Sequence, residues 1–284
     1  MTENIWILLV LFYGLSKGVR DGLKKLSMEK SSLMEVLLFH SLLAFIFTVP
    51  FTRDVFGIPP LFYLLIFLKS FVIFLAWIFS FKSINKMPLS YFGIMDMSRV
   101  VFSTCLGLFL LGETMDIPNI IGLVLVLAGL FLVNIRKNSP VNEDASKKYV
   151  WLTLLSCLLN AMSGTMDKIY TKYVTPGQLQ FWYMFFMVAL YIIYVITTKT
   201  HVRVSALSSN IWIWILSILF VLADRALFVA NSMEGSQVTV MTLIKQSSVI
   251  VTILFGKYIF KEKNILFKLL CSLIIIAGIG ISLL

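Results

Sequence analysis

Ten long runs of apolar residues, joined by short polar connections, constrain the fold of this chain more than any other feature of its sequence. A helix needs about 20 predominantly apolar residues to cross the hydrocarbon core of a bilayer. Backbone polar groups inside a bilayer must be hydrogen-bonded within the protein, and these runs are too long for barrel strands. We therefore predict an all-α membrane protein with ten transmembrane helices. The predicted helices span residues 4–22, 33–52, 60–82, 88–112, 118–136, 149–171, 177–198, 210–231, 237–257 and 264–284.

Composition and charge exclude several other classes of protein. The hydrophobic fraction is 59% and the charged fraction 13%, whereas a soluble domain is about 45–50% apolar and about 25% charged. The net charge of +10 lies mostly in connections between apolar runs, where basic residues report membrane topology rather than nucleic-acid binding. The 3 cysteines and 2 histidines have no metal-binding spacing. We expect no enzyme activity, cofactor, metal or nucleic-acid partner.

The two halves of the chain contain a repeated pattern. The first half ends with Leu111-Gly112-Glu113 and an apolar run that contains Ala128-Gly129. The second half ends with Phe260-Lys261-Glu262 and a run that contains Ala277-Gly278, at a constant offset of 149 positions. Because a unit of five spans is odd, its second copy would insert upside down, as in many transporter folds. We predict one five-helix repeat over 1–136, a linker over 137–148 and an inverted repeat over 149–284.

Lysine and arginine are unevenly distributed between the two predicted sides of the membrane. The side that holds the termini carries three of them, Arg53, Lys168 and Lys172. The other side carries fifteen, namely Arg20, Lys24, Lys25, Lys30, Lys82, Lys86, Arg136, Lys137, Lys147, Lys148, Lys199, Arg203, Lys257, Lys261 and Lys263. The positive-inside rule places the richer side, with the linker 137–148, in the cytoplasm. We therefore expect a multi-pass protein of the inner (plasma) membrane with both termini outside.

Ten spans in two inverted halves, each closing with a fourth helix, a glutamate-containing link and an Ala-Gly helix, resemble the drug/metabolite transporter superfamily. The most similar branch is that of the EamA-type ten-helix carriers, and the resemblance covers nearly the whole chain. It implies a central cavity lined mainly by the first, third and fourth helices of each half. It also implies alternating access by rocking of those helices, with the fifth helix of each half at the periphery.

Charged residues deep in the predicted spans are the candidates for a functional site, because a charge near the bilayer centre costs several kcal/mol to insert. Asp96, Arg99 and Lys245 lie about eight or more residues from either end of their spans, which is ~12 Å at 1.5 Å per residue. Lys69 is similarly deep in its span. The offset of 149 positions aligns Asp96 with Lys245, so we expect these two to pair, directly or through substrate, in at least one conformation. Three charges lie nearer span ends and are expected to reach the headgroup region: Lys17, Glu35 and Asp167.

Two interpretations of the deep charges remain open at this point. They could form structural ion pairs within helices, Asp96–Arg99 and Asp224–Arg225, or they could line a cavity that binds substrate. The basic residues outnumber the acidic ones, which favours a carboxylate or phosphate as part of the substrate. The predicted substrate-binding residues are Lys69, Asp96, Arg99, Asp224, Arg225, Lys245, His40, Trp77 and Thr242.

The function predicted from these features is secondary active transport. The substrate would be a small anionic or zwitterionic metabolite, such as an amino acid or a sugar phosphate, moved by alternating access. No nucleotide-binding loop is present in the sequence, so ATP is not the expected energy source. The alternatives are a multidrug exporter and a flippase for a lipid-linked sugar. The expected partners are the bilayer and the substrate, while a coupling ion and the choice between monomer and homodimer stay open.

Overall fold

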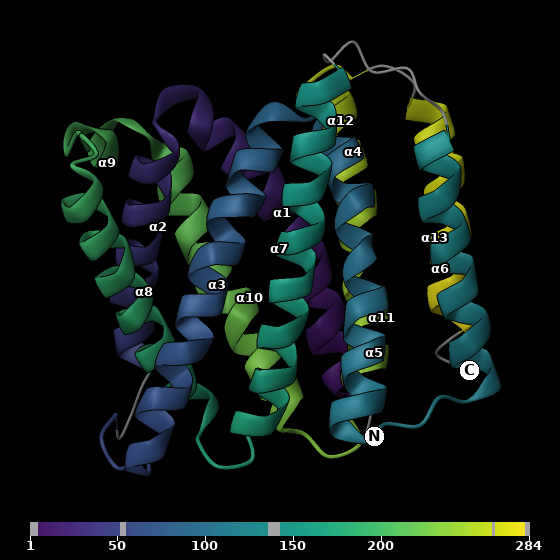
Figure 1. Ribbon diagram of the computed structural model, residues 1–284, viewed down its shortest axis with the longest axis horizontal. Helices are drawn as coiled ribbons and strands as arrows, with labels where there is room; N and C mark the ends of the chain where they lie inside the picture. The colour runs from purple at the N-terminus through teal and green to yellow at the C-terminus, as the bar shows by residue number, and fades with distance from the viewer. Residues whose placement is uncertain (1–4, 52–54, 136–142, 263–264, 282–284) are drawn as a thin grey trace.

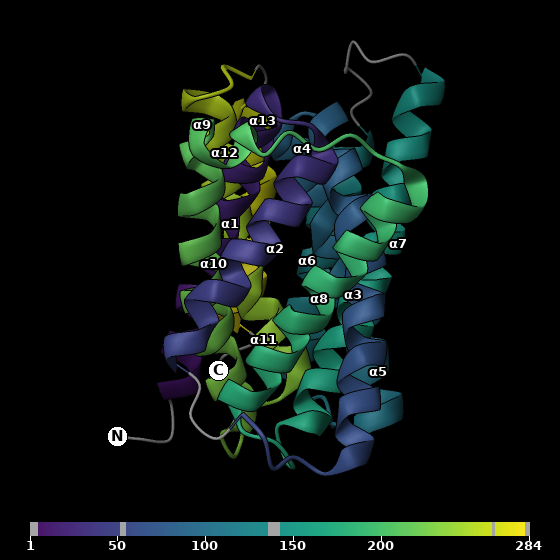
Figure 2. The ribbon, with the colours of Figure 1, turned by 90° about the vertical axis from the view of Figure 1, so that its left-hand side faces the viewer.

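The computed structural model describes residues 5–51, 55–135, 143–262 and 265–281, and every regular element in these ranges is a helix. The long helices run roughly along one common direction in a single bundle (Figure 1, Figure 2). The elements are α1 (Ile5–Lys30), α2 (Leu33–Thr48), η1 (Val49–Phe51), α3 (Pro60–Lys86), α4 (Leu89–Met95), η2 (Asp96–Ser98), α5 (Arg99–Leu111), α6 (Ile117–Ile135), α7 (Glu143–Tyr170), α8 (Pro176–Thr198), α9 (Ser205–Ser209), α10 (Ile211–Ser232), α11 (Val238–Lys245), α12 (Ser248–Tyr258) and α13 (Ile265–Ile281).

Six helical segments in the described ranges are long and apolar enough to cross a membrane. Two of these segments each combine a pair of helices, α4 with α5 and α11 with α12. The six are Pro60–Lys86, Leu89–Leu111, Lys147–Tyr170, Pro176–Thr198, Ile211–Ser232 and Val238–Tyr258. Three shorter apolar helical segments are Leu33–Thr48, Ile117–Gly129 and Ile265–Gly278. The helical fold is therefore confirmed, while ten membrane crossings stay a prediction.

The first predicted helix ends eight residues too early, because α1 continues to Lys30 through a charged segment. Ion pairs at helical spacing hold this extension, since Asp21 contacts Lys17 at 3.4 Å and Lys24 at 2.7 Å. At the linker, α7 begins at Glu143, earlier than the predicted 149. Residues 137–142 of the predicted linker lie outside the described ranges.

Two predicted spans, 88–112 and 237–257, are each broken in the middle. The first break is the 3₁₀ turn η2 after Met95, and the second separates Lys245 from Ser248. At both breaks a side chain donates a hydrogen bond to a backbone carbonyl. The Ser98 hydroxyl donates to the Met95 carbonyl at 2.5 Å, and the Gln246 side-chain amide donates to the Thr242 carbonyl at 2.9 Å. The breaks fall at positions that are related by the offset of the repeat.

A glutamate from each half caps a helix of the other half. The Glu113 carboxylate accepts hydrogen bonds from the backbone N–H groups of Val238 at 2.6 Å and Thr239 at 3.1 Å, at the start of α11. The Glu262 carboxylate accepts equivalent bonds from the first residues of α4, with Leu89 N–H at 2.5 Å. A carboxylate at a helix N-terminus satisfies free donors and favours the helix dipole. Because α4 and α11 begin at opposite ends of the bundle (Figure 1), the two caps fasten the halves together at both ends.

A stripe of small residues on α1 brings this helix close to the second broken helix. Gly14, Gly18 and Gly22 lie one turn apart, and a Cβ on Gly18 would stand 2.5 Å from the Ser248 carbonyl oxygen. Small residues at this spacing permit close helix–helix approach in membrane proteins. At the edge of the bundle, α6 and α13 pack on each other (Figure 1), as the peripheral fifth helices were expected to do.

Candidate functional site

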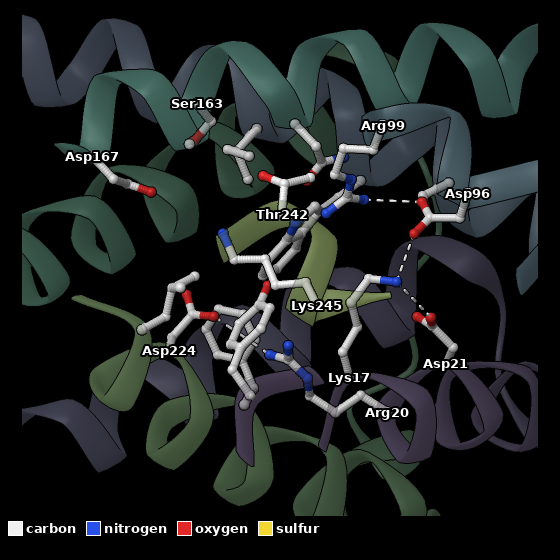
Figure 3. Close-up of a pocket in the computed structure, with 18 of the residues that line it drawn as sticks. Lys17, Arg20, Asp21, Asp96, Arg99, Ser163, Asp167, Asp224, Thr242 and Lys245 are labelled. Carbon is white, nitrogen blue, oxygen red and sulfur yellow. Dashed lines mark hydrogen bonds and ion pairs between the residues drawn. The ribbon is translucent and has the colours of Figure 1, made fainter. Parts of the chain in front are cut away.

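A central cavity rich in charged side chains is lined by helices of both halves (Figure 3). Its charged side chains are Lys17, Arg20, Asp21, Lys24, Lys69, Asp96, Arg99, Asp167, Asp224 and Lys245. Six are cationic and four are anionic. With ordinary ionisation at neutral pH, this lining has an excess of two positive charges.

Eight of the nine predicted site residues line this cavity. They are His40, Lys69, Trp77, Asp96, Arg99, Asp224, Thr242 and Lys245. The ninth, Arg225, lies outside the lining, and its guanidinium group lies close to Gly177 at the start of α8. Adjacent residues on a helix point about 100° apart, so Asp224 faces the cavity while Arg225 does not.

One face of α1 supplies five lining residues that were not among the predicted site residues: Tyr13, Lys17, Arg20, Asp21 and Lys24. Lys17 was expected to reach the membrane surface, and Arg20 and Lys24 were assigned to a cytoplasmic connection. Those assignments placed the end of the helix too early. The signal in the sequence was that Tyr13, Lys17, Asp21 and Lys24 follow one another at intervals of three or four residues, which places them on one helix face.

Asp167 was likewise expected near the membrane surface, but it is 5% exposed and lines the cavity. Its carboxylate contacts the Lys69 ammonium at 3.2 Å. Glu35, the third residue placed at a span end, does lie at one. It forms a capping box with Ser32 at the start of α2 and accepts hydrogen bonds from Arg203.

Asp96 joins α1 to the first broken helix. One carboxylate oxygen contacts the Lys17 ammonium at 2.6 Å, and the other contacts the Arg99 guanidinium at 2.9 Å. The proposed intrahelical pair Asp96–Arg99 is therefore present, together with a contact to α1. The expected direct contact of Asp96 with Lys245 is not present in this conformation, because both carboxylate oxygens are engaged by other cations.

Two further ion pairs lie among aromatic rings. Asp224 contacts Arg20 at 3.5 Å, and the Arg20 guanidinium lies 5.0 Å from the centre of the Tyr13 ring. The Lys69 ammonium lies 3.8 Å from the centre of the Tyr183 ring. Aromatic faces stabilise cations that have lost part of their hydration. Two of the six positive charges of the cavity, Arg20 and Lys69, are therefore paired with a carboxylate and also lie against an aromatic ring.

Lys245 differs from the other cations of the cavity. In the described part of the chain, no carboxylate lies within 4 Å of its ammonium group, whereas each of the other five cavity cations has such a partner. Its ammonium nitrogen lies 5.7 Å from the centre of the Tyr13 ring. Lys245 is partly buried, and a cation that has lost part of its hydration is unfavourable without a counter-ion unless a ligand supplies one. Lys245 is therefore the position in the cavity most suited to bind an anionic group.

Comparison with known proteins agrees with this architecture. The family model of the EamA-like transporter family matches the chain twice, over residues 4–135 and 147–284. One solved crystal structure has the same fold, with a TM-score of 0.68, 12% sequence identity and coverage of 96% of each chain. A search of curated proteins gives no match.

The two matches of the family model divide the chain where the sequence repeat divides it, and together they cover nearly all of it. The apolar helices and the charged cavity fit a membrane transporter. The chain belongs to the EamA-like transporter family, within the drug/metabolite transporter superfamily.

Proposed function

We propose that this protein is a secondary active transporter that moves a small anionic or zwitterionic metabolite, such as an amino acid or a sugar phosphate. In this proposal ten helical segments cross the inner (plasma) membrane, and the linker 137–148 faces the cytoplasm. The observation that carries the proposal is the net positive cavity with Lys245 unpaired in the described part of the chain.

Binding would begin with the anionic group of the substrate at Lys245. The Arg99 guanidinium lines the same cavity and keeps donors beyond the one that contacts Asp96. An anion held by both residues would bridge the two broken helices, because Arg99 begins α5 and Lys245 ends α11. Substrate binding at this place would then couple the two halves of the protein.

The broken helices also suggest how access could alternate. Each break divides a span into two segments joined by one short turn, so the segments can tilt separately. In the proposed cycle, the halves rock about the charged cavity while α6 and α13 stay at the edge of the bundle. The caps at Glu113 and Glu262 would limit how far each end can open.

A thermal-shift screen of the purified protein against amino acids, sugar phosphates and amines tests the proposal. A ligand at 100 times its Kd stabilises the native state by about 2.7 kcal/mol. For a chain of this size, that corresponds to a rise in Tm of about 5–10 °C. We expect anionic or zwitterionic compounds to produce the rise, and the same compounds to show counterflow in proteoliposomes.

The matched variants are Lys245→Gln, which removes the unpaired cavity charge, and Lys257→Gln, which removes an exposed charge from α12. Lys245→Gln should abolish both the thermal shift and counterflow, while Lys257→Gln should retain both. Stabilisation by apolar cations alone would refute the proposal and favour a multidrug exporter. Stabilisation by lipid-linked sugars alone would favour a flippase.

A further inference from the structure

Each carboxylate of the cavity is already engaged by a cation of the protein. In the described part of the chain, the four carboxylates are each within 3.5 Å of a lysine or arginine nitrogen. The ammonium group of a zwitterionic substrate would have to share a carboxylate whose charge a lysine or arginine of the protein already balances. A substrate that carries only negative charge needs no such sharing, since Lys245 has no carboxylate partner in the described part of the chain.

Three hydroxyl groups of the cavity are also available. Ser103 on α5, Ser163 on α7 and Thr242 on α11 line the cavity, and within the described residues their hydroxyls have no hydrogen bond. Several buried helical hydroxyls elsewhere in this protein bond to the carbonyl one turn earlier, as Ser70 does to Ile66 at 2.7 Å. The three free hydroxyls can donate to a ligand and accept from it.

These groups lie on neighbouring helices. Thr242 and Lys245 are one turn apart on α11, Arg99 and Ser103 are one turn apart on α5, and α5 packs against both α7 and α11. In Figure 3 Thr242 lies in the middle of the view, with Arg99 to one side and Ser163 to the other, and the Lys245 side chain extends towards the side of Asp167 and Asp224. The arrangement therefore offers one unpaired positive charge beside several neutral hydrogen-bonding groups.

We infer that the substrate is a hydroxyl-rich, water-soluble organic anion without a positive charge, such as a sugar acid or a sugar phosphate. Its anionic group contacts Lys245, and its hydroxyls contact Ser103, Ser163 and Thr242. This inference rests on the proposed function and narrows it, because it excludes amino acids and other zwitterions as the preferred substrates.

Three six-carbon carboxylates of similar length test the inference by calorimetry on the purified full-length protein. Gluconate carries the charge and the hydroxyls, hexanoate carries the charge alone, and glucosaminate replaces one hydroxyl of gluconate by an ammonium group. We expect gluconate to bind at least about tenfold more tightly than hexanoate, because two or more additional hydrogen bonds form. We also expect it to bind at least about tenfold more tightly than glucosaminate, because the ammonium group of glucosaminate would enter a cavity with an excess of positive charge. Equal or tighter binding of hexanoate or glucosaminate would overturn the inference.

Substitutions of single cavity residues test which side chains contact the substrate. Lys245→Gln should weaken gluconate binding at least about tenfold, and Ser163→Ala should weaken it about fivefold while hexanoate binding stays unchanged. The exposed Ser208→Ala serves as a control that should leave both affinities unchanged. If Ser163→Ala and Thr242→Val both leave the preference for gluconate over hexanoate intact, the hydroxyl contacts are refuted.

The outcomes separate the inference from the proposed function. Binding of glucosaminate or an amino acid that depends on Lys245, in preference to gluconate, would leave the carrier proposal standing and refute the inference. The absence of Lys245-dependent binding by any anion would refute both. Glucose 6-phosphate and polyprenyl-phosphate-linked glucose share a sugar and a phosphate, and tighter binding of the lipid-linked form would refute a water-soluble substrate.

Discussion

The ion pairs of the cavity predict that two of its lysines, Lys69 and Lys245, contribute to stability with opposite sign. Lys69 is 2% exposed and is the cation that contacts Asp167, so Lys69→Met would leave a buried carboxylate without a counter-ion. Removing one partner of a buried pair typically costs about 3–5 kcal/mol. Lys245→Met removes a charge that has no ion pair in the described part of the chain, and we expect it to be neutral or stabilising.

Thermal unfolding in detergent measures this contrast. With about 2–4 °C per kcal/mol for a chain of this size, Lys69→Met should lower Tm by about 6–20 °C. Lys245→Met should leave Tm unchanged or raise it when no ligand is present. The double variant with Lys69→Met and Asp167→Asn should recover part of the loss, since no buried charge then lacks a partner. Equal destabilisation by the two lysine substitutions would show that our assignment of partners is wrong.

Three other predictions concern the architecture. Glu113→Gln removes the carboxylate that caps α11, and we expect it to lower the Tm measured by thermal unfolding by about 2–8 °C. The exposed Glu234→Gln is the control and should leave Tm unchanged. Gly18→Ala should reduce Tm and the yield of folded protein because its Cβ would meet the backbone of α12, whereas Gly280→Ala, which has open space around it, should be neutral or slightly stabilising. A Ser139→Cys variant should resist a membrane-impermeant thiol reagent added to intact cells, and efficient labelling would place the linker outside.

The positions of the helices were largely predictable, because long apolar runs can hardly adopt another structure in a bilayer. The repeat was predictable for a similar reason, since Glu113 and Glu262 stand at equivalent places in two similar stretches of sequence. The function of these two glutamates was not predictable. It depends on which helix of the other half begins beside each carboxylate, and one sequence does not contain that distance.

The charged residues of α1 show why hydropathy alone does not predict where this helix ends. A rule that ends a span at the first cluster of charges separates Arg20 and Lys24 from the bundle, yet their partners lie inside it. The breaks at Asp96 and Lys245 were not predicted either, because neither segment contains a proline or glycine at the break. The expected contact between Asp96 and Lys245 followed from their equivalent positions in the repeat and their similar depth, whereas Lys17 reaches Asp96 from a neighbouring helix.

The reciprocal caps also set an order for events during synthesis. The carboxylate that caps α11 has already been made when α11 emerges from the ribosome, because Glu113 precedes that helix by 125 positions. The helix α4 is synthesised before its cap, since Glu262 follows Leu89 by 173 positions. At about 5–20 residues per second, the delay is about 9–35 s. During that interval the start of α4 lacks its carboxylate cap, so the packing of the first half can be completed only after Glu262 has been made.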